Sequence, residues 1–545
     1  MLALCWRKNC LGSGKSNSKS LSTPEFVKVN FIFDPTFIII MEKKARITLL
    51  PLNQTFEVEK ESQLHDVLFV YGVEFPCGGH ARCRGCRIRI REGHLPVTTP
   101  QKQILNDTEI KDGWRLACQG LVYDDLIIEL DQWKSDVLSD DSDFNFIPMD
   151  GLGVAIDLGT TTLAAQLVNR ETGEVLAVET AINPQARFGG DIMTRIDTAS
   201  RLKKQEEMQQ LIRDQLFEMI MNLFQSSQTV KNDLKRIIIV GNAVMHNIFC
   251  GIDVEPMGFH PFEPISNNLE IYSSEEIGWD LNKDVVLEFL PGVGSFIGSD
   301  ILVGAWVENM SESDEIRVLV DLGTNGEIMV GNRDKILAAS TAAGPAFEGA
   351  GISMGMRAAT GAISTVLAKN GEIIPKVLGS EKPRGICGSG LVDAVSAYLD
   401  MGLIKADGRF LDGESIMVLN PVEITQKDIR ELQLAKGAIA TGIRLLLQEL
   451  NSKEENVAEV YLSGAFGNYI SKRSSRRIGL LNFPQKKITT AGNTALLGAK
   501  KALFNEEELN NFYDIRSKTD HLDLSIHPDF TDVFAELVNF PERGD

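Results

Sequence analysis

The chain has 545 residues, of which 43% are apolar, so it is long enough for two to four domains with separate cores. Its formal net charge of −20 excludes a broad nucleic-acid surface, which requires a basic face. No stretch reaches the roughly 18 apolar residues of a membrane span. We therefore expect a cytoplasmic protein that binds neither nucleic acid nor membrane.

Residues 1–41 differ in character from the rest of the chain, because their first 25 positions are rich in Ser, Lys and Asn without periodicity. The tract from Gly12 to Ser16 imitates the end of a phosphate-binding P-loop, but Asn9 stands where that motif needs glycine. An alternating strand pattern begins soon after Met41. We expect residues 1–41 to be a disordered extension or a mis-assigned start.

Eight cysteines in 545 residues are too few for a disulfide scaffold. Residues 42–133 hold four of them. Cys77, Cys83, Cys86 and Cys118 follow the spacing C-x5-C-x2-C-x31-C. Four thiolates are what a 2Fe–2S cluster requires, and the glycines of the first loop let backbone N–H groups approach the sulfides. Zinc ribbons usually show two paired C-x2-C knuckles, and only one such pair is present. A 2Fe–2S cluster is favoured over zinc and over four buried thiols without metal.

The secondary-structure elements predicted for this domain are short. In chain order they are a hairpin of 46–51 and 55–58, a helix over about 63–71 and a strand over 88–91. An acidic, Ser-containing linker over 134–151 then precedes a larger module.

The larger module, residues 152–545, contains an internal repeat. Asp157 and Asp321 each end an apolar strand, and each opens the sequence Asp-Leu-Gly-Thr before a second strand. Glycine and threonine at such a turn offer N–H and hydroxyl donors to phosphate oxygens. The aspartate can hold hydrated Mg²⁺ or orient a water molecule. One copy could be an ordinary turn, but two copies 164 residues apart favour a phosphate-binding pair.

The predicted phosphate-binding residues are Gly159, Thr160, Thr161 and Thr162 in the first loop and Gly323, Thr324, Asn325, Gly326 and Glu327 in the second. We expect catalytic roles for Asp157 and Asp321.

This pair of loops resembles the phosphate loops of the acetate-kinase, sugar-kinase, Hsp70 and actin superfamily. The resemblance implies an α/β two-lobed ATPase domain, with lobe one at about 152–315, lobe two at about 316–505 and a C-terminal extension at 506–545. It also implies an adenosine loop after a strand, which Ser463, Gly464, Ala465 and Gly467 match. A helix over about 427–450 precedes that strand.

The cysteine loop resembles plant-type and adrenodoxin-type ferredoxins, which implies an α+β ferredoxin-like (β-grasp) fold for residues 42–133. Together, residues 42–545 resemble the ATP-dependent reductive activators of corrinoid proteins. That resemblance implies a 2Fe–2S cluster, ATP and Mg²⁺ as cofactors and a Co(II) corrinoid protein as electron acceptor, returned to Co(I) for a methyltransferase system. An external low-potential electron donor is also implied, and a homodimer is left open.

Three other functions stay open at this point. The chain could be an electron carrier with a regulatory nucleotide-binding module, or a small-molecule kinase with a redox sensor, although no sugar-binding constellation is visible. Activators of 2-hydroxyacyl dehydratases share the nucleotide module, but they bridge a 4Fe–4S cluster between subunits and do not need this ferredoxin domain.

Overall fold

The structure is a computed structural model, and it describes residues 44–50, 54–69, 87–105, 107–130, 146–189, 191–323, 325–341, 343–349, 351–356, 358, 361–369, 371–378, 382–467, 470–504 and 506–542. The extension expected at 1–41 lies outside these ranges, as do Cys77, Cys83, Cys86 and Thr324.

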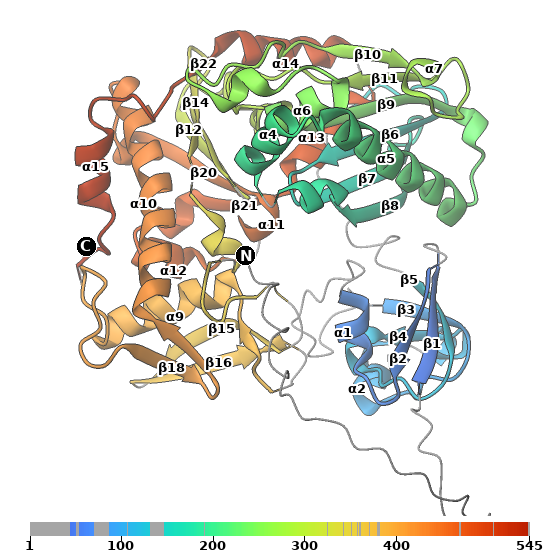
Figure 1. The fold of residues 1–545 in the computed structure, drawn as a ribbon, viewed down its shortest axis with the longest axis horizontal. Coiled ribbons are helices and arrows are strands. Elements are labelled where there is room, and N and C mark those ends of the chain that lie inside the picture. The colour runs from blue at the N-terminus through green and yellow to red at the C-terminus, as the bar shows by residue number, and fades with distance from the viewer. Residues whose placement is uncertain are drawn as a thin grey trace, which may run out of the picture. The chain divides into compact units, whose positions relative to one another are not determined.

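The N-terminal part is a five-stranded sheet in the order β2-β1-β5-β3-β4 (Figure 1). Alternation along β1 buries Ala45, Ile47 and Leu49 completely. β1 is antiparallel to β2 and parallel to β5, as in a β-grasp fold, so the predicted fold class is confirmed here. The strands are Lys44–Leu50 (β1), Gln54–Glu59 (β2), Arg87–Glu92 (β3), Trp114–Leu116 (β4) and Leu126–Leu130 (β5). The helices are Leu64–Phe69 (α1), Thr99–Ile104 (α2) and Asp107–Lys111 (α3).

The larger part contains two six-stranded sheets, β10-β11-β9-β6-β7-β8 and β21-β20-β12-β13-β14-β22. Five strands have the same order in both, and the sixth lies at opposite edges, as β10 beyond β11 and as β22 beyond β14. Each has an antiparallel meander of three strands, and a later strand joins parallel to the first strand of that meander. The sequence repeat is therefore a repeat of the fold. The first sheet comprises Leu152–Leu158 (β6), Thr162–Asn169 (β7), Val175–Ile182 (β8), Leu234–Gly241 (β9), Glu270–Ser273 (β10) and Val286–Phe289 (β11). The second comprises Ile316–Leu322 (β12), Gly326–Gly331 (β13), Ile336–Thr341 (β14), Val457–Ser463 (β20), Ile488–Gly492 (β21) and Thr519–His521 (β22).

Helices cover both faces of each sheet. One face of the first sheet packs on α4, α5 and α6, while α8 and α13 share a core with its other face and with the second sheet. α10 covers the remaining face of the second sheet, α15 lies on α10, and α9 packs on the strand Ala362–Lys369 (β15). The bounds are Ile192–Arg201 (α4), Gln205–Ser227 (α5), Ala243–Cys250 (α6), Ser274–Ile277 (α7), Ser299–Val307 (α8), Gly388–Met401 (α9), Gln426–Glu449 (α10), Gly464–Gly467 (α11), Lys472–Arg477 (α12), Thr494–Ala502 (α13), Glu506–Lys518 (α14) and Phe530–Leu537 (α15).

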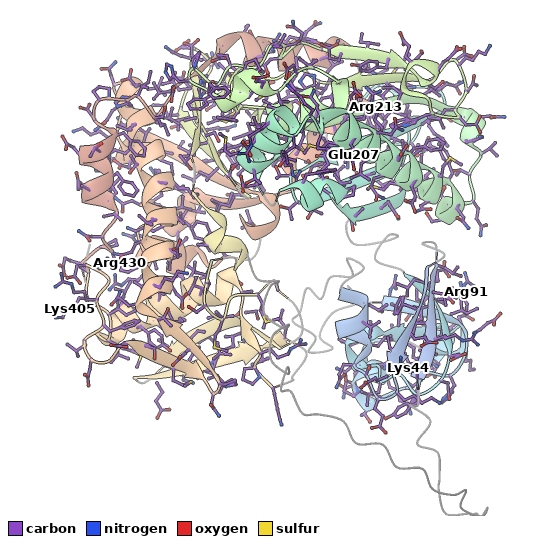
Figure 2. All side chains as sticks on the ribbon, in the orientation of Figure 1. Lys44, Arg91, Glu207, Arg213, Lys405 and Arg430 are labelled. Carbon is purple, nitrogen blue, oxygen red and sulfur yellow. The ribbon has the colours of Figure 1, made fainter. Side chains whose placement is uncertain are left out.

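Side chains also connect neighbouring helices within one layer. Arg213 of α5 donates twice to the carbonyl oxygen of Phe249 on α6, at 3.0 and 2.7 Å (Figure 2). The predicted helix over about 427–450 is confirmed as α10, which a Thr425–Asp428 capping box begins. A smaller set of strands precedes it in the chain: Ala362–Lys369 (β15), Glu372–Val377 (β16), Gly385–Ile386 (β17), Ser415–Leu419 (β18) and Val422–Thr425 (β19). Over the described ranges, no helix combines the length and apolar character that a membrane crossing needs.

The contact between α8 and α13 depends on a residue without a side chain. A Cβ atom on Gly498 would lie 2.4 Å from Cβ of Val303, well inside van der Waals contact. We expect Gly498→Ala to lower the free energy of unfolding by about 1–3 kcal/mol, since an added methyl group there forces the helices apart. Chemical denaturation measures this change. The exposed substitution Gln210→Ala on α5 should change it by less than about 0.5 kcal/mol, and equal stability of the two variants would contradict the packing argument.

Candidate nucleotide site and cluster domain

The first phosphate loop is the turn between β6 and β7. Gly159 is required there, because a Cβ atom would lie 2.5 Å from the carbonyl oxygen of Thr162. Asn183 fixes the turn twice: its side chain donates to the carbonyl of Gly159 at 2.9 Å, and its backbone N–H donates to that of Thr161 at 2.8 Å. The Thr160 hydroxyl accepts from Asn242 at 2.9 Å. Buried polar side chains thus hold the loop in place through hydrogen bonds.

The second phosphate loop joins β12 to β13 in the same way. The N–H of Gly323 donates to the carbonyl of Asn325 at 3.2 Å, which closes the turn. Gly326 leaves room for the hydroxyl of Thr341, which donates to its carbonyl at 3.1 Å. Asp321 lies opposite Glu327 in the β12–β13 register, so the ladder brings both carboxylates to the same end of the sheet.

The predicted adenosine loop meets the second phosphate loop at Asp321. β20 runs parallel to β12 and places Ser463 beside Asp321, and the serine hydroxyl donates to the carboxylate at 2.7 Å. Gly464 adopts a φ of +82°, and a Cβ atom on it would lie 2.7 Å from the same carboxylate. Gly464, Ala465 and Gly467 form the short turn α11. The structure thus brings Ser463 and Gly464 together with Asp321.

Asp157 is oriented by a residue far away in the sequence. Asn493, which caps the N-terminus of α13, donates to Asp157 at 2.9 Å. Burial raises the pKa of Asp157 to about 7, the bond from Asn493 opposes this rise, and the charge of Asp321 adds to it. The effect of Asp321 on this pKa indicates that the aspartates of the two repeats lie near each other.

A third aspartate, Asp300, joins this group from the first turn of α8. Burial raises its pKa to about 8, and the charges of Asp157 and Asp321 contribute to the rise. Gly298 and Ser299 fix this helix start to the end of β9: Ser299 accepts from the N–H of Gly241 at 3.1 Å. Burial and then the charge of Asp300 raise the pKa of Glu327 as well.

We call Asp157, Asp300, Asp321 and Glu327 the carboxylate cluster. Its members resist ionisation because burial and mutual repulsion both disfavour negative charge. Within the described ranges, no three Asp, Glu, His or Cys side chains lie close enough to hold a metal ion by themselves. The cluster can therefore take a cation only together with other oxygen ligands, such as water or phosphate, which are the ligands that Mg²⁺ prefers.

Sequence reasoning missed Asp300, Asn493 and Asn183. A usable signal for Asp300 was the sequence Gly298-Ser299-Asp300 at the start of an apolar helix. Gly and Ser commonly precede helices whose N-termini bind anions. Asn493 could have been suspected as a cap before the small-residue helix that follows it. Nothing local distinguishes Asn183, since its role comes from tertiary contact.

The cluster domain contributes one described ligand candidate, Cys118. Its side chain is 3% exposed and lies in the 3-10 turn Ala117–Gln119, directly after β4. Gln101 is also buried, and its side chain accepts from the N–H of Leu116 at 3.2 Å, which fixes the approach to this turn. A buried thiol on a fixed turn suits a cluster ligand, whereas the other three cysteines lie outside the described residues.

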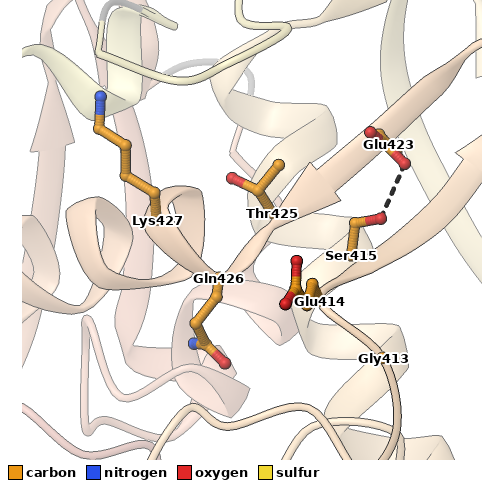
Figure 3. A pocket seen from close by; sticks show the side chains of 7 residues that line it. All are labelled: Gly413, Glu414, Ser415, Glu423, Thr425, Gln426 and Lys427. Atoms are coloured by element: carbon orange, nitrogen blue, oxygen red, sulfur yellow. Dashed lines mark hydrogen bonds between the residues drawn. The ribbon is translucent and has the colours of Figure 1, made fainter.

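A separate cavity of about 600 Å³ lies at the N-terminus of α10 (Figure 3). Two of its polar side chains have partners within the protein: the Ser415 hydroxyl donates to Glu423 at 2.8 Å, and Gln426 donates to the carbonyl of Gly408 at 2.8 Å. None of the predicted nucleotide residues lines it.

The fold and the site define a protein with a ferredoxin-type 2Fe–2S domain joined to an actin-, Hsp70- and sugar-kinase-type domain. Three family descriptions match in succession: "2Fe-2S iron-sulfur cluster binding domain" over 47–123, "RACo middle region" over 152–313 and "C-terminal domain of RACo the ASKHA domain" over 315–545. The chain belongs to the RACo family.

Two relatives and one solved structure cover most of the chain. Corrinoid activation enzyme RamQ of Eubacterium limosum is 30% identical, over 91% of this chain and 99% of its own length. The [Co(II) methylated amine-specific corrinoid protein] reductase of Methanosarcina barkeri is 28% identical, over 72% of this chain and 77% of its own. The solved structure of a reductive activator for corrinoid, iron-sulfur protein is 25% identical with a TM-score of 0.65, over 91% and 98% of the two chains.

The carboxylate cluster should make the nucleotide-free protein less stable at high pH. A carboxyl group whose pKa is raised by folding keeps its proton while the unfolded chain loses it, so the free energy of unfolding falls between about pH 4 and pH 8. We expect Asp300→Asn to raise the melting temperature by about 2–4 °C at pH 8 and by less at pH 5.

Thermal unfolding of the nucleotide-free protein at the two pH values measures this effect. Asp284→Asn, at an exposed position, should leave the melting temperature unchanged at both. A gain at pH 5 equal to that at pH 8 would show that ionisation is not the cause.

Proposed function

We propose that this protein uses ATP to drive the one-electron reduction of an inactive Co(II) corrinoid protein to Co(I), in the service of a corrinoid methyltransferase system. One observation carries the proposal: two duplicated phosphate loops converge on a carboxylate cluster in the same chain as a 2Fe–2S domain. The names of the relatives support it, since they describe a corrinoid activation enzyme and a corrinoid protein reductase.

In this proposal Cys77, Cys83, Cys86 and Cys118 hold the 2Fe–2S cluster, which when bound accepts and releases one electron at a time. The buried position of Cys118 keeps its thiol away from solvent. An external low-potential donor reduces the protein, and a reducing cytoplasm keeps the cysteines available for the cluster.

The two phosphate loops bind the phosphates of ATP, and the adenosine loop at Ser463–Gly467 binds the nucleoside. Asp157 and Asp321 hold Mg²⁺ through water and phosphate oxygens. The raised pKa values of the carboxylate cluster support this assignment, because a divalent cation would offset the repulsion that burial makes costly. Asn493 and Ser463 orient the two aspartates by hydrogen bonds.

ATP binding or hydrolysis changes the distance between the two loops and with it the way the protein engages the corrinoid partner. Such a change can raise the effective cobalt potential, for example through an axial ligand. For one electron, about 59 mV corresponds to a factor of ten in equilibrium constant, so ATP turnover can offset several such factors.

The test is to mix the reduced, cluster-loaded protein with a Co(II) corrinoid protein, with and without ATP, and to follow the Co(I) absorption band. We expect the band to grow only with ATP. Growth at the same rate and to the same extent without ATP would contradict an ATP-dependent activator and would favour a simple electron carrier.

Two substitutions should separate the modules. We expect Cys83→Ser to abolish electron transfer while ATP binding is unchanged, since one thiolate ligand is lost. We expect Asp321→Ala to lower ATP hydrolysis by about 100-fold or more, because the cation loses a ligand, while the visible spectrum of the cluster is unchanged. For Cys83→Ser, Co(I) formation and ATP binding are measured; for Asp321→Ala, ATP hydrolysis and cluster absorbance are measured. Loss of both properties in one variant would indicate misfolding instead.

A further inference from the structure

Arg195 is a charged residue that none of the roles above uses. It lies on α4 with an exposure of 0% and is among the largest fully buried side chains of the described protein. Its guanidinium donates to the carbonyl of Thr160 at 2.6 Å, to that of Gly189 at 3.0 Å and to the side chain of Gln185 at 3.4 Å. A whole arginine is thus buried directly behind the first phosphate loop.

Among the described residues, no carboxylate forms an ion pair with Arg195. Its hydrogen-bond acceptors in the described structure are carbonyl and amide oxygens and the sulfur of Met245, at 3.5 Å. Asp191 acts on it electrostatically, but that carboxylate is exposed and caps α4 by accepting from Thr194. Burial lowers the pKa of Arg195 only to about 10, so it stays protonated at neutral pH. Burying a cation without a paired anion is unfavourable unless an anion is available elsewhere.

The bonds from Arg195 and Asn183 also determine how the loop presents its peptides. Arg195 donates to the carbonyl of Thr160, and Asn183 donates to the carbonyl of Gly159. In a planar trans peptide the N–H points opposite to the C=O. Two successive peptides therefore direct their N–H ends away from these donors, and a charged donor on the carbonyl strengthens the dipole of its peptide.

We propose that Arg195 is a positioning residue for the phosphate chain of ATP, which both fixes the first phosphate loop and supplies the positive potential that a polyphosphate needs beside the carboxylate cluster. This inference rests on the ATP-binding part of the proposed function. It explains why a cation lies under the loop although the residues of the loop itself are uncharged.

The test compares ATP affinity, measured by titration calorimetry with Mg²⁺ on the full-length, cluster-loaded protein. We expect Arg195→Met to weaken ATP binding by about tenfold, because the carbonyl of Thr160 loses a hydrogen bond from a charged group and a bond of this kind has that magnitude. Arg195→Lys keeps the charge but loses the forked geometry, and we expect an intermediate loss. Arg201→Met removes an exposed arginine from the same helix and should bind ATP as the unchanged protein does.

A second variant separates charge from structure. Gln185→Glu places a carboxylate beside Arg195 without removing any bond from the arginine to the loop. We expect it to weaken ATP binding several-fold, to leave the affinity for adenosine unchanged and not to lower the melting temperature by more than Arg195→Met does.

The outcomes are distinct. Arg195→Met or a folded Gln185→Glu with the ATP affinity of the unchanged protein would overturn the inference. An equal loss of affinity for ATP and for adenosine would show that Arg195 has only a structural role, and this result would also overturn the inference. If Arg195→Met does not fold, Arg195→Lys and Gln185→Glu decide. Because ATP binding is measured without a corrinoid protein, failure of cobalt reduction would not be mistaken for failure of this inference.

Discussion

The mutual repulsion of Asp157, Asp300, Asp321 and Glu327 is the constraint around which the nucleotide domain is organised. Separate carboxylates belong in water, yet these four lie partly or wholly buried where the ends of two sheets and one helix meet. Each of the two sheet aspartates has a neutral donor, Asn493 or Ser463, that holds it in place without removing its charge. The cluster thus keeps an affinity for cations that a set of internal salt bridges would have used up.

This arrangement gives the duplication of the fold a physical purpose. One sheet alone supplies one loop and one aspartate, and that is a weak site for a polyphosphate with its cation. Two copies supply loops that can approach a ligand from opposite sides, while α8 and α13 occupy the space that the two sheets share. Arg195 adds a positive charge behind the first phosphate loop, so the electrostatic potential at this loop is more positive than at the carboxylate cluster.

The parts of the site that were predictable from sequence are those with a local signature. The two Asp-Leu-Gly-Thr turns were visible because strand, aspartate and glycine are adjacent in the chain, and the ladder then places Glu327 and Ser463 by register. Asn183 and Arg195 carry no such signature, because they act on a loop 24 and 35 positions away. Asp300 and Asn493 carry only the local signal of a helix start, and their place in the site comes from tertiary contact. A lone arginine in an amphipathic helix looks like a surface residue until tertiary structure buries it.

The helix α13 belongs to the last hundred residues of the chain, yet it packs against β6 and β9 of the first sheet. The boundary between the two RACo descriptions, at residues 313 and 315, therefore does not separate two self-sufficient folding units. A fragment that stops at this boundary would keep α8 but leave Ala155, Ile238 and Val240 without α13, the second helix of their core. The core of the first sheet is therefore complete only when this late segment of the chain is present.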